Sequence, residues 1–264
     1  MGDLFKDSDR DNIIEMRGIG QSYDQGENWI IKGLDFLVED KPGQGQFVVI
    51  MGASGCGKST LLRYMAGLQD PTEGEVLLKG KKPSNDNRVS MVFQQYSSLP
   101  WYTVLDNVCL GLKYQGIAKS EREDRAMEMI KLVGLDGHEQ KHAQYPTLSG
   151  GQLQRVAIAR SLLSNPDIIV MDEPFGALDV KTRFQMQQLL ADIWLQFHST
   201  VIFVTHDVSE AVFLGDDIYL MKSAPSDFAH HYSVDLPMVR NRGTKRTSEY
   251  TNLVSEIEDV MSIL

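Results

Sequence analysis

A glycine-rich stretch carries the clearest chemistry in the sequence. It comprises Gly52, Ala53, Ser54, Gly55, Cys56, Gly57, Lys58 and Ser59, followed by Thr60. The stretch matches the pattern G-x-x-x-x-G-K-[ST], and it lies between an apolar run and a helical pattern. Backbone N–H groups of such a loop converge on phosphate oxygens, Lys58 adds a point charge at the β- and γ-phosphates, and Ser59 can ligate Mg²⁺. The pattern therefore predicts a phosphate-binding loop rather than a glycine-rich turn with a surface lysine.

Two carboxylates follow a second apolar run. Residues 168–171 are Ile-Ile-Val-Met, and Asp172 and Glu173 come directly after them. Beside bound phosphates, Asp172 would hold Mg²⁺, and Glu173 would accept a proton from the attacking water or orient it. The alternative is a solvated acidic turn, which the phosphate loop makes the weaker interpretation.

Three further side chains are candidates for the same site. His206 ends the run that begins at Val201, and it could contact the γ-phosphate, although an isolated histidine there would more often be structural. Gln94 follows Val92 and Phe93 and could reach Mg²⁺ and the attacking water. Tyr23 could stack on an adenine ring, with a core or exposed tyrosine as the equal alternative.

The apolar runs indicate how the chain positions these groups. Residues 47–51, 168–171 and 201–204 are continuously apolar, which is typical of strands covered on both faces. Open α/β sheets bind ligands at the carboxyl ends of their strands, and a candidate segment follows each run. We therefore expect a parallel sheet whose carboxyl edge gathers the candidates.

Helical patterns separate the expected strands. Leu61, Tyr64, Met65 and Leu68 predict one apolar helix face, and Ser120 with Glu123 predicts a capping box. A third helix should begin near Gly150 and end before Asn165-Pro166.

The expected organisation has several parts. Residues 95–163 form an inserted helical subdomain, whereas residues 12–50 and 74–93 include an antiparallel β subdomain to which Val89–Phe93 is assigned. Residues 1–11 are expected to be a mobile tail. Residues 241–264 are expected to be a carboxyl-terminal extension with a helix, beyond a nucleotide-binding domain over residues 12–240.

Composition excludes several classes of protein. The net charge of −10 disfavours nucleic acid as a partner. Cys56 and Cys109 are too few for a disulfide framework, which fits a reducing cytoplasm. No apolar run approaches the roughly 18 residues that a membrane-spanning helix needs.

A second glycine-containing motif makes the identification much narrower. It consists of Leu148, Ser149, Gly150, Gly151 and Gln152. With it, residues 12–240 resemble the nucleotide-binding subunits of ATP-binding cassette (ABC) transporters, which carry this signature motif beside a phosphate loop. In the resemblance, Gln94 matches the Q-loop, Asp179 the D-loop, His206 the switch histidine and Tyr23 the A-loop.

The resemblance implies a P-loop NTPase fold with a RecA-like α/β core, an antiparallel β subdomain and an inserted α-helical subdomain. It also implies ATP and Mg²⁺ as ligands and two copies arranged head to tail, each ATP lying between the phosphate loop of one copy and the signature motif of the other. Ser149 and two glycines at a helix start would suit a γ-phosphate.

A narrower resemblance concerns residues 99–108 and 234–237, which look like segments of bacterial importers of nitrate, sulfonate and taurine. It implies an energy-coupling ATPase at the cytoplasmic face of the inner membrane, with a permease and a substrate-binding protein as partners. Trp101 and Tyr102, in the segment 96–108, would face the permease. Residues 223–227 depart from the group's pattern, because they lack a proline-glycine-arginine sequence.

Other functions stay open at this stage. An exporter or lipid-trafficking ATPase would show the same motifs, and a non-transport cassette protein or a regulatory module belongs to another class. The basic cluster Arg240, Arg242, Lys245 and Arg246 is expected to be a solvated face, with anionic lipid or permease contact as the alternative.

Overall fold

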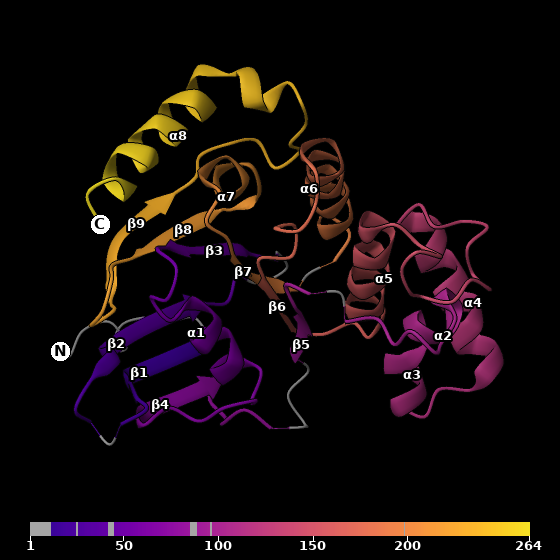
Figure 1. Ribbon diagram of the computed structural model, residues 1–264, viewed down its shortest axis with the longest axis horizontal. Helices are drawn as coiled ribbons and strands as arrows, with labels where there is room; N and C mark the ends of the chain where they lie inside the picture. The colour runs from indigo at the N-terminus through magenta and orange to yellow at the C-terminus, as the bar shows by residue number, and fades with distance from the viewer. Residues whose placement is uncertain (1–11, 25, 42–44, 85–88, 96, 198) are drawn as a thin grey trace.

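The computed structural model describes residues 12–264 except 25, 42–44, 85–88, 96 and 198 (Figure 1). The predicted tail, residues 1–11, and Tyr96 of the predicted permease-facing segment lie outside the described residues. The strands are β1 Asn12–Ser22, β2 Trp29–Glu39, β3 Phe47–Gly52, β4 Glu73–Leu78, β5 Val89–Val92, β6 Ile168–Asp172, β7 Thr200–Val204, β8 Asp217–Met221 and β9 Phe228–Ser233. The helices are α1 Lys58–Met65, α2 Val104–Val108, α3 Leu110–Tyr114, α4 Lys119–Leu132, α5 Gly150–Leu163, α6 Val180–Trp194, α7 Val208–Leu214, the 3₁₀ helix η1 Thr244–Arg246 and α8 Ser248–Met261.

The core of the molecule is a six-stranded sheet in the order β5-β6-β7-β3-β8-β9. The first five strands in this order, β5, β6, β7, β3 and β8, pair in parallel, and β9 runs antiparallel to β8 at the edge. Every residue of β3 and β7 is buried, as expected for strands covered on both faces. The predicted central parallel strands are therefore confirmed.

A smaller antiparallel sheet, in the order β2-β1-β4, forms a second layer below the core sheet (Figure 1). The prediction that Val89–Phe93 belongs to this subdomain is wrong. Val89–Val92 pairs in parallel with Ile168–Met171 instead and forms the other edge of the core sheet. A four-residue apolar run fits either kind of sheet, so the pattern alone could not decide between them.

Helices α2 to α5 form the inserted helical subdomain, which projects to one side of the core (Figure 1). The predicted capping box at its longest amphipathic helix is wrong, because α4 begins at Lys119 and Ser120 lies within it. Glu123 pairs with Lys119 at 3.7 Å between Nζ and Oε1 rather than reaching a cap. Gly134, with φ 69°, ends this helix as predicted.

Helix α1 is shorter than its apolar pattern predicts. It ends at Met65, and Gly67 adopts φ 65°. The Gly67 and Leu68 N–H groups then donate to the carbonyls of Tyr64 and Arg63, which is the Schellman arrangement. Leu68 is consequently carried away from the core and is 60% exposed, contrary to the prediction that it shares the buried face.

The carboxyl-terminal part folds back onto the core. Helix α8 packs against α7 through Tyr250, which is buried, and Ile257 lies in the main hydrophobic core. Figure 1 shows α8 above β8 and β9. Among the described residues, no helix is both long and apolar enough to cross a bilayer.

The four basic residues near the carboxyl terminus do not form one surface. Arg240 is 4% exposed and donates to the carbonyls of Phe213 and Gly215 and to Asp216. Lys245 also turns inward, whereas Arg242 and Arg246 are exposed. The predicted solvated face is therefore wrong for Arg240 and Lys245, because buried acceptors draw their cationic groups into the molecule.

Candidate active site

The phosphate loop connects β3 to α1. Gly55 and Gly57 have φ values of 82° and 93°, a region that residues with a Cβ rarely adopt. The turn brings Lys58 back over the loop, where its Nζ donates to the carbonyls of Gly52 and Ala53, both at 2.9 Å. Cys56 is buried, and burial raises the pKa of its thiol, so this side chain stays protonated at neutral pH.

A hydroxyl and a carboxylate lie side by side at the start of α1. Ser59 donates from Oγ to Oδ1 of Asp172 at 2.9 Å, although the two residues are 113 positions apart. Burial raises the pKa of Asp172, and the hydrogen bond from Ser59 opposes that shift. Oxygen ligands of this kind suit Mg²⁺. Among the described residues, no group of three or more His, Cys, Asp or Glu side chains could hold a metal ion.

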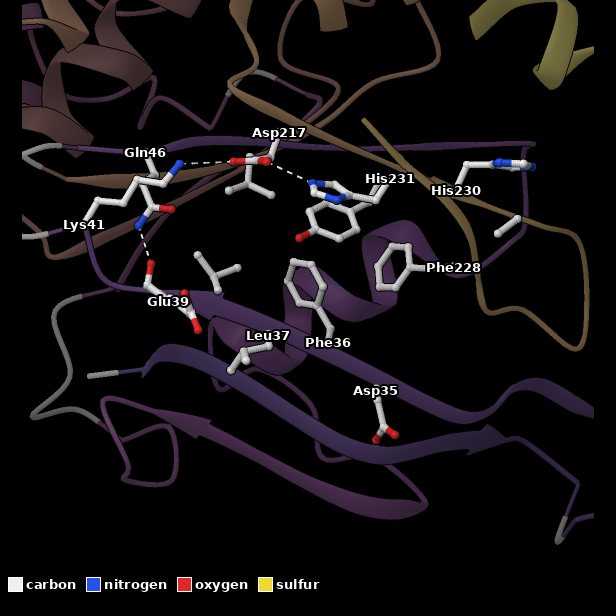
Figure 2. Close-up of a pocket in the computed structure, with 14 residues that line it drawn as sticks. Asp35, Phe36, Leu37, Glu39, Lys41, Gln46, Asp217, Phe228, His230 and His231 are labelled. Atoms are coloured by element: carbon white, nitrogen blue, oxygen red, sulfur yellow. Dashed lines mark hydrogen bonds and ion pairs between the residues drawn. The ribbon is translucent and has the colours of Figure 1, made fainter. Parts of the chain in front are cut away.

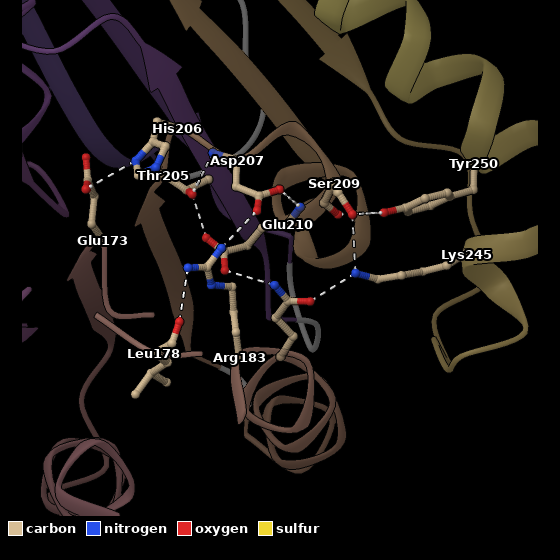
Figure 3. Close-up of polar contacts among 11 residues, drawn as sticks. Glu173, Leu178, Arg183, Thr205, His206, Asp207, Ser209, Glu210, Lys245 and Tyr250 are labelled. Carbon is tan, nitrogen blue, oxygen red and sulfur yellow. Dashed lines mark hydrogen bonds and ion pairs between the residues drawn. The ribbon is translucent and has the colours of Figure 1, made fainter. Parts of the chain in front are cut away.

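Glu173 joins two other predicted residues. Its Oε2 lies 3.1 Å from Nε2 of Gln94. The same oxygen lies 3.3 Å from Nδ1 of His206 (Figure 3). Register explains the meeting: β5, β6 and β7 pair in parallel, so the residues that follow them emerge at one edge.

The backbone at Glu173 is unusual for a residue with a long side chain. Its φ is 42°, in the left-handed region, while its N–H donates to the carbonyl of Val204 at 3.0 Å. Such strained positions persist where surrounding contacts hold them and cluster at functional sites. The strain therefore supports a functional interpretation of this carboxylate.

Tyr23 follows β1 and is 65% exposed. Its Oη accepts a hydrogen bond from Nε2 of Gln69 at 3.4 Å. No hydrogen bond within the described part of the chain links its side chain to the phosphate loop, so adenine stacking stays a prediction.

The signature motif lies at the start of α5. Ser149 is the N-cap: its Oγ accepts from the N–H of Gln152, and Oε1 of Gln152 accepts from the N–H of Ser149 at 2.9 Å. Leu148 is fully buried and anchors this turn. No hydrogen bond or ion pair between described side chains connects the motif to the phosphate loop. Figure 1 shows α1 and α5 well apart, so the phosphate loop and the signature motif of one chain do not meet.

Asp179 of the predicted D-loop is the N-cap of α6. Its Oδ1 accepts from the N–H groups of Lys181 and Thr182 at 3.1 and 3.0 Å. Hydrogen bonds from Thr182 hold the pKa of this carboxyl below its ordinary value. The same helix start contacts the signature motif, because a Cβ on Gly151 would lie 2.5 Å from Cγ2 of Thr182.

Sequence reasoning missed two polar residues behind the site, Asp207 and Glu210. Thr205 and Asp207 flank His206, and both contact Glu210 on α7. The spacing D-x-x-E at Asp207 and Glu210 is that of a helix cap and could have drawn attention to them. The Glu210 side chain does not close a capping box, since it turns to Thr205 instead.

A cavity of about 630 Å³ lies elsewhere, between β2 and the strands β8 and β9 (Figure 2). Asp217 pairs there with Lys41 and His231 at 3.3 and 2.8 Å. Its described lining includes none of the predicted ATP-binding residues.

Comparison with known proteins agrees with this geometry. The family model described as ABC transporter matches residues 39–176, more than half of the chain. The chain belongs to the ABC transporter family. The taurine import ATP-binding protein of Rhizobium johnstonii is 45% identical over 242 residues, covering 88% of this chain and 89% of that protein. The nitrate import ATP-binding protein of a Synechocystis species is 43% identical over 226 residues, covering 82% and 84%.

A solved ABC structure extends the comparison to the fold. It is a dimeric, post-hydrolysis ATP-binding cassette bound to ADP and Pi, 34% identical, with a TM-score of 0.71 and coverage of 85% of this chain and 100% of that one. The predicted P-loop NTPase fold is confirmed. The chain is an ABC ATPase that binds ATP, whereas the roles of individual residues stay predictions.

Proposed function

We propose that this ABC ATPase is the energy-coupling subunit of an importer for a small anion or organic solute. The observation that carries the catalytic part is the cluster in which Glu173 meets both Gln94 and His206 at the carboxyl edge of the core sheet. This edge lies beside the phosphate loop, because the hydrogen bond between Ser59 and Asp172 joins the two.

The site residues divide the chemistry between them. Loop N–H groups from Gly52 to Thr60 and the Lys58 ammonium would hold the phosphates, and Tyr23 would stack on the base. Ser59, Asp172 and Gln94 would hold Mg²⁺, which when bound neutralises charge on the β- and γ-phosphates. Glu173 would take a proton from the attacking water, while His206, whose Nδ1 lies 3.3 Å from Oε2 of Glu173, would contact the γ-phosphate.

Two subunits are needed for a complete site. The signature motif lies far from the phosphate loop of the same chain, so Ser149 and the α5 amino terminus would contact ATP bound by a second copy. The dimeric cassette structure supports this arrangement. Because ATP would contact both copies only in the closed dimer, its binding would favour closure, and hydrolysis would reopen it.

The relatives named for taurine and nitrate import support the import direction and the solute class. In this proposal a permease dimer binds two copies at the cytoplasmic face of the inner membrane, and a substrate-binding protein delivers the solute. Trp101, which is 66% exposed on the helical subdomain, would face the permease.

The test is copurification from native membranes. A tagged Glu173→Gln subunit is extracted in detergent with ATP and Mg²⁺, and the proteins that accompany it are identified by mass spectrometry. We expect a multi-span permease together with a substrate-binding protein, and much less of both with a Trp101→Ala control. Recovery of only DNA-associated or ribosomal proteins would contradict the transport function while leaving the ATPase intact.

A further inference from the structure

A buried carboxylate lies directly behind the segment that carries His206. Glu210, on α7, is 3% exposed. Its Oε2 accepts from Oγ1 of Thr205 at 2.5 Å, and its Oε1 accepts from Nε2 of Gln187 at 3.0 Å (Figure 3). Thr205 immediately precedes His206, so the carboxylate holds the backbone from which the histidine projects.

The neighbouring residue is held by the same helix. Oγ1 of Thr205 accepts from the N–H of Asp207 at 3.1 Å, and Oδ1 of Asp207 accepts from the N–H of Glu210 at 3.0 Å. Both residues that flank His206 are thus bonded to Glu210 or to its helix start. A shift of Glu210 would consequently move the histidine relative to Glu173.

The buried carboxylate connects through Gln187 to a cation in the carboxyl-terminal segment. Oε1 of Gln187 accepts from Nζ of Lys245 at 3.0 Å. A carboxylate on one side and an ammonium on the other fix the amide in a single orientation, donor toward Glu210 and acceptor toward Lys245. Lys245 is held over the rings of Phe213 and Phe184, at 4.6 and 5.2 Å from their centroids.

A second contact ties α8 to α7. Oη of Tyr250 donates to the Ser209 carbonyl at 2.7 Å and lies 2.7 Å from Oγ of the same serine. Nζ of Lys245 also reaches that Oγ, at 3.4 Å. The carboxyl-terminal segment therefore touches α7 on the residue next to Glu210.

The D-loop is attached to the segment from Thr205 to Asp207, which carries His206. Arg183, on α6, lies 3.6 Å from Oδ2 of Asp207 through Nη1 and donates through Nη2 to the carbonyl of Leu178 at 3.1 Å. Leu178 precedes Asp179, the helix cap. Gln187 is on the same helix, one turn further along, so α6 carries both connections.

We propose that the carboxyl-terminal segment, residues 244–261, positions His206 for ATP hydrolysis through the hydrogen-bonded chain Lys245–Gln187–Glu210–Thr205. Lys245 and Glu210 are positioning residues in this arrangement, since neither touches the reacting atoms. The inference rests on the proposed roles of Glu173 and His206.

The electrostatics of the chain make it sensitive to loss of one end. A buried charge whose partner is removed is left uncompensated, whereas removal of both charges leaves neutral groups that can still form hydrogen bonds. Without Lys245, the Gln187 amide is free to rotate, and Glu210 loses its fixed donor. The segment from Thr205 to Asp207 then has an alternative arrangement.

The experiment compares steady-state ATP hydrolysis by full-length variants. Lys245→Met keeps the apolar stem over the two rings and removes the charge, and Arg246→Met is the matched control at an exposed neighbour. We expect Lys245→Met to lower kcat about tenfold with KM for ATP unchanged, and Glu210→Gln/Lys245→Met to recover part of that loss, because the two residues are coupled. Arg246→Met should match the wild type.

Melting temperatures measured on the same proteins separate positioning from simple support of the fold. If Lys245→Met lowers the Tm but hydrolyses ATP with the wild-type kcat well below that Tm, the inference is overturned. The Glu210→Gln single variant is measured beside them, and the inference is also overturned if the double variant is impaired by the sum of the effects of Glu210→Gln and Lys245→Met. Normal hydrolysis by Glu173→Gln would instead overturn the proposed site itself, an outcome distinguishable from the other two.

Discussion

The phosphate-loop region and the signature region reach order by different means. Residues of the first come from distant parts of the chain and are bonded to one another, as Ser59 is to Asp172 and Gln94 to Glu173. The signature motif is bonded to itself, through the reciprocal cap of Ser149 and Gln152. The edge of the core sheet assembles the first region within one chain. In the proposed function, the second region acts on ATP bound by another copy.

The largest expected effect tests the phosphate-loop region. Glu173→Gln should retain ATP binding, lower turnover about 1000-fold as expected for loss of a general base, and accumulate an ATP-bound dimer. Phosphate release measures turnover, and size-exclusion chromatography with ATP measures the dimer.

Glutamine retains the acceptor oxygen that meets Gln94 and has nearly the same volume as glutamate, so the fold should be preserved. Equal melting temperatures for the two proteins would show this. Hydrolysis at the wild-type rate would remove Glu173 from the role of base.

The second prediction tests the difference between the regions directly. Lys58→Ala should weaken ATP binding, and Ser149→Arg should block the signature surface, so each variant alone should lose about 100-fold in activity. In a mixed dimer, the intact phosphate loop of one chain faces the intact signature of the other. Equal mixtures should therefore regain about a quarter of the wild-type activity, because half the dimers are mixed and each holds one complete site.

The control mixes Lys58→Ala with Lys58→Ala/Ser149→Arg, a combination that leaves no complete site in any dimer. If the first mixture stays as inactive as this control after subunit exchange, the two regions do not act across a dimer.

The separate motifs of the phosphate-loop region could be predicted from sequence because each of them is a short, continuous segment. A loop that cradles phosphates needs glycines at fixed spacing, and continuous apolar runs specify strands buried on both faces. Parallel pairing then brings the residues after Met171 and Val204 to one edge, as predicted, whereas Gln94 joins them because Val89–Val92 pairs in parallel with β6.

The errors arose where a tertiary partner decides between two locally acceptable structures. Arg240 and Lys245 look like surface cations, and only the folded chain shows the buried carbonyls and the Gln187 amide that bind them. The short run Val89–Val92 joined the core sheet because β6 offers an edge. The contact between Ser59 and Asp172, by contrast, agrees with two motifs that predict binding to the same ion. The number of residues between these motifs in the chain does not affect that prediction.

The third prediction concerns the contact between the signature helix and the D-loop helix. Gly151→Ala should displace Thr182, because the added Cβ would lie 2.5 Å from Cγ2 of that residue. We expect a loss of about 1–3 kcal/mol in the free energy of unfolding, the usual effect of overpacking, measured by urea denaturation.

The matching control is Gly151→Ala/Thr182→Ser, which removes the obstructing methyl group. It should recover most of the lost stability. A double variant as unstable as the single one would mean that helix α5 needs glycine for another reason.

The smallest expected effect separates function from stability within the phosphate-loop region. Burial raises the pKa of Asp172, chiefly because its charged form is desolvated, and Glu173 adds repulsion. As the pH rises from the ordinary value of 3.8 through the folded value, the folded chain holds a proton that the unfolded chain has released, so this group's contribution to stability falls. Asp172→Asn should accordingly raise the Tm at pH 7 by a few degrees without nucleotide.

Asparagine can still accept the hydrogen bond from Ser59, so the gain reflects the charge alone, and it should shrink as the pH falls and the wild-type carboxyl is protonated. Asp179→Asn is the control of opposite sign, since hydrogen bonds lower the pKa of Asp179 and its charge stabilises the fold above pH 3.8. Thermal unfolding at several pH values measures both. If the Tm of Asp172→Asn at pH 7 is below that of the wild type, the carboxylate supports the fold. If the Tm rises and Mg²⁺-dependent hydrolysis is lost, the wild-type protein retains a destabilising carboxylate because that group binds the metal.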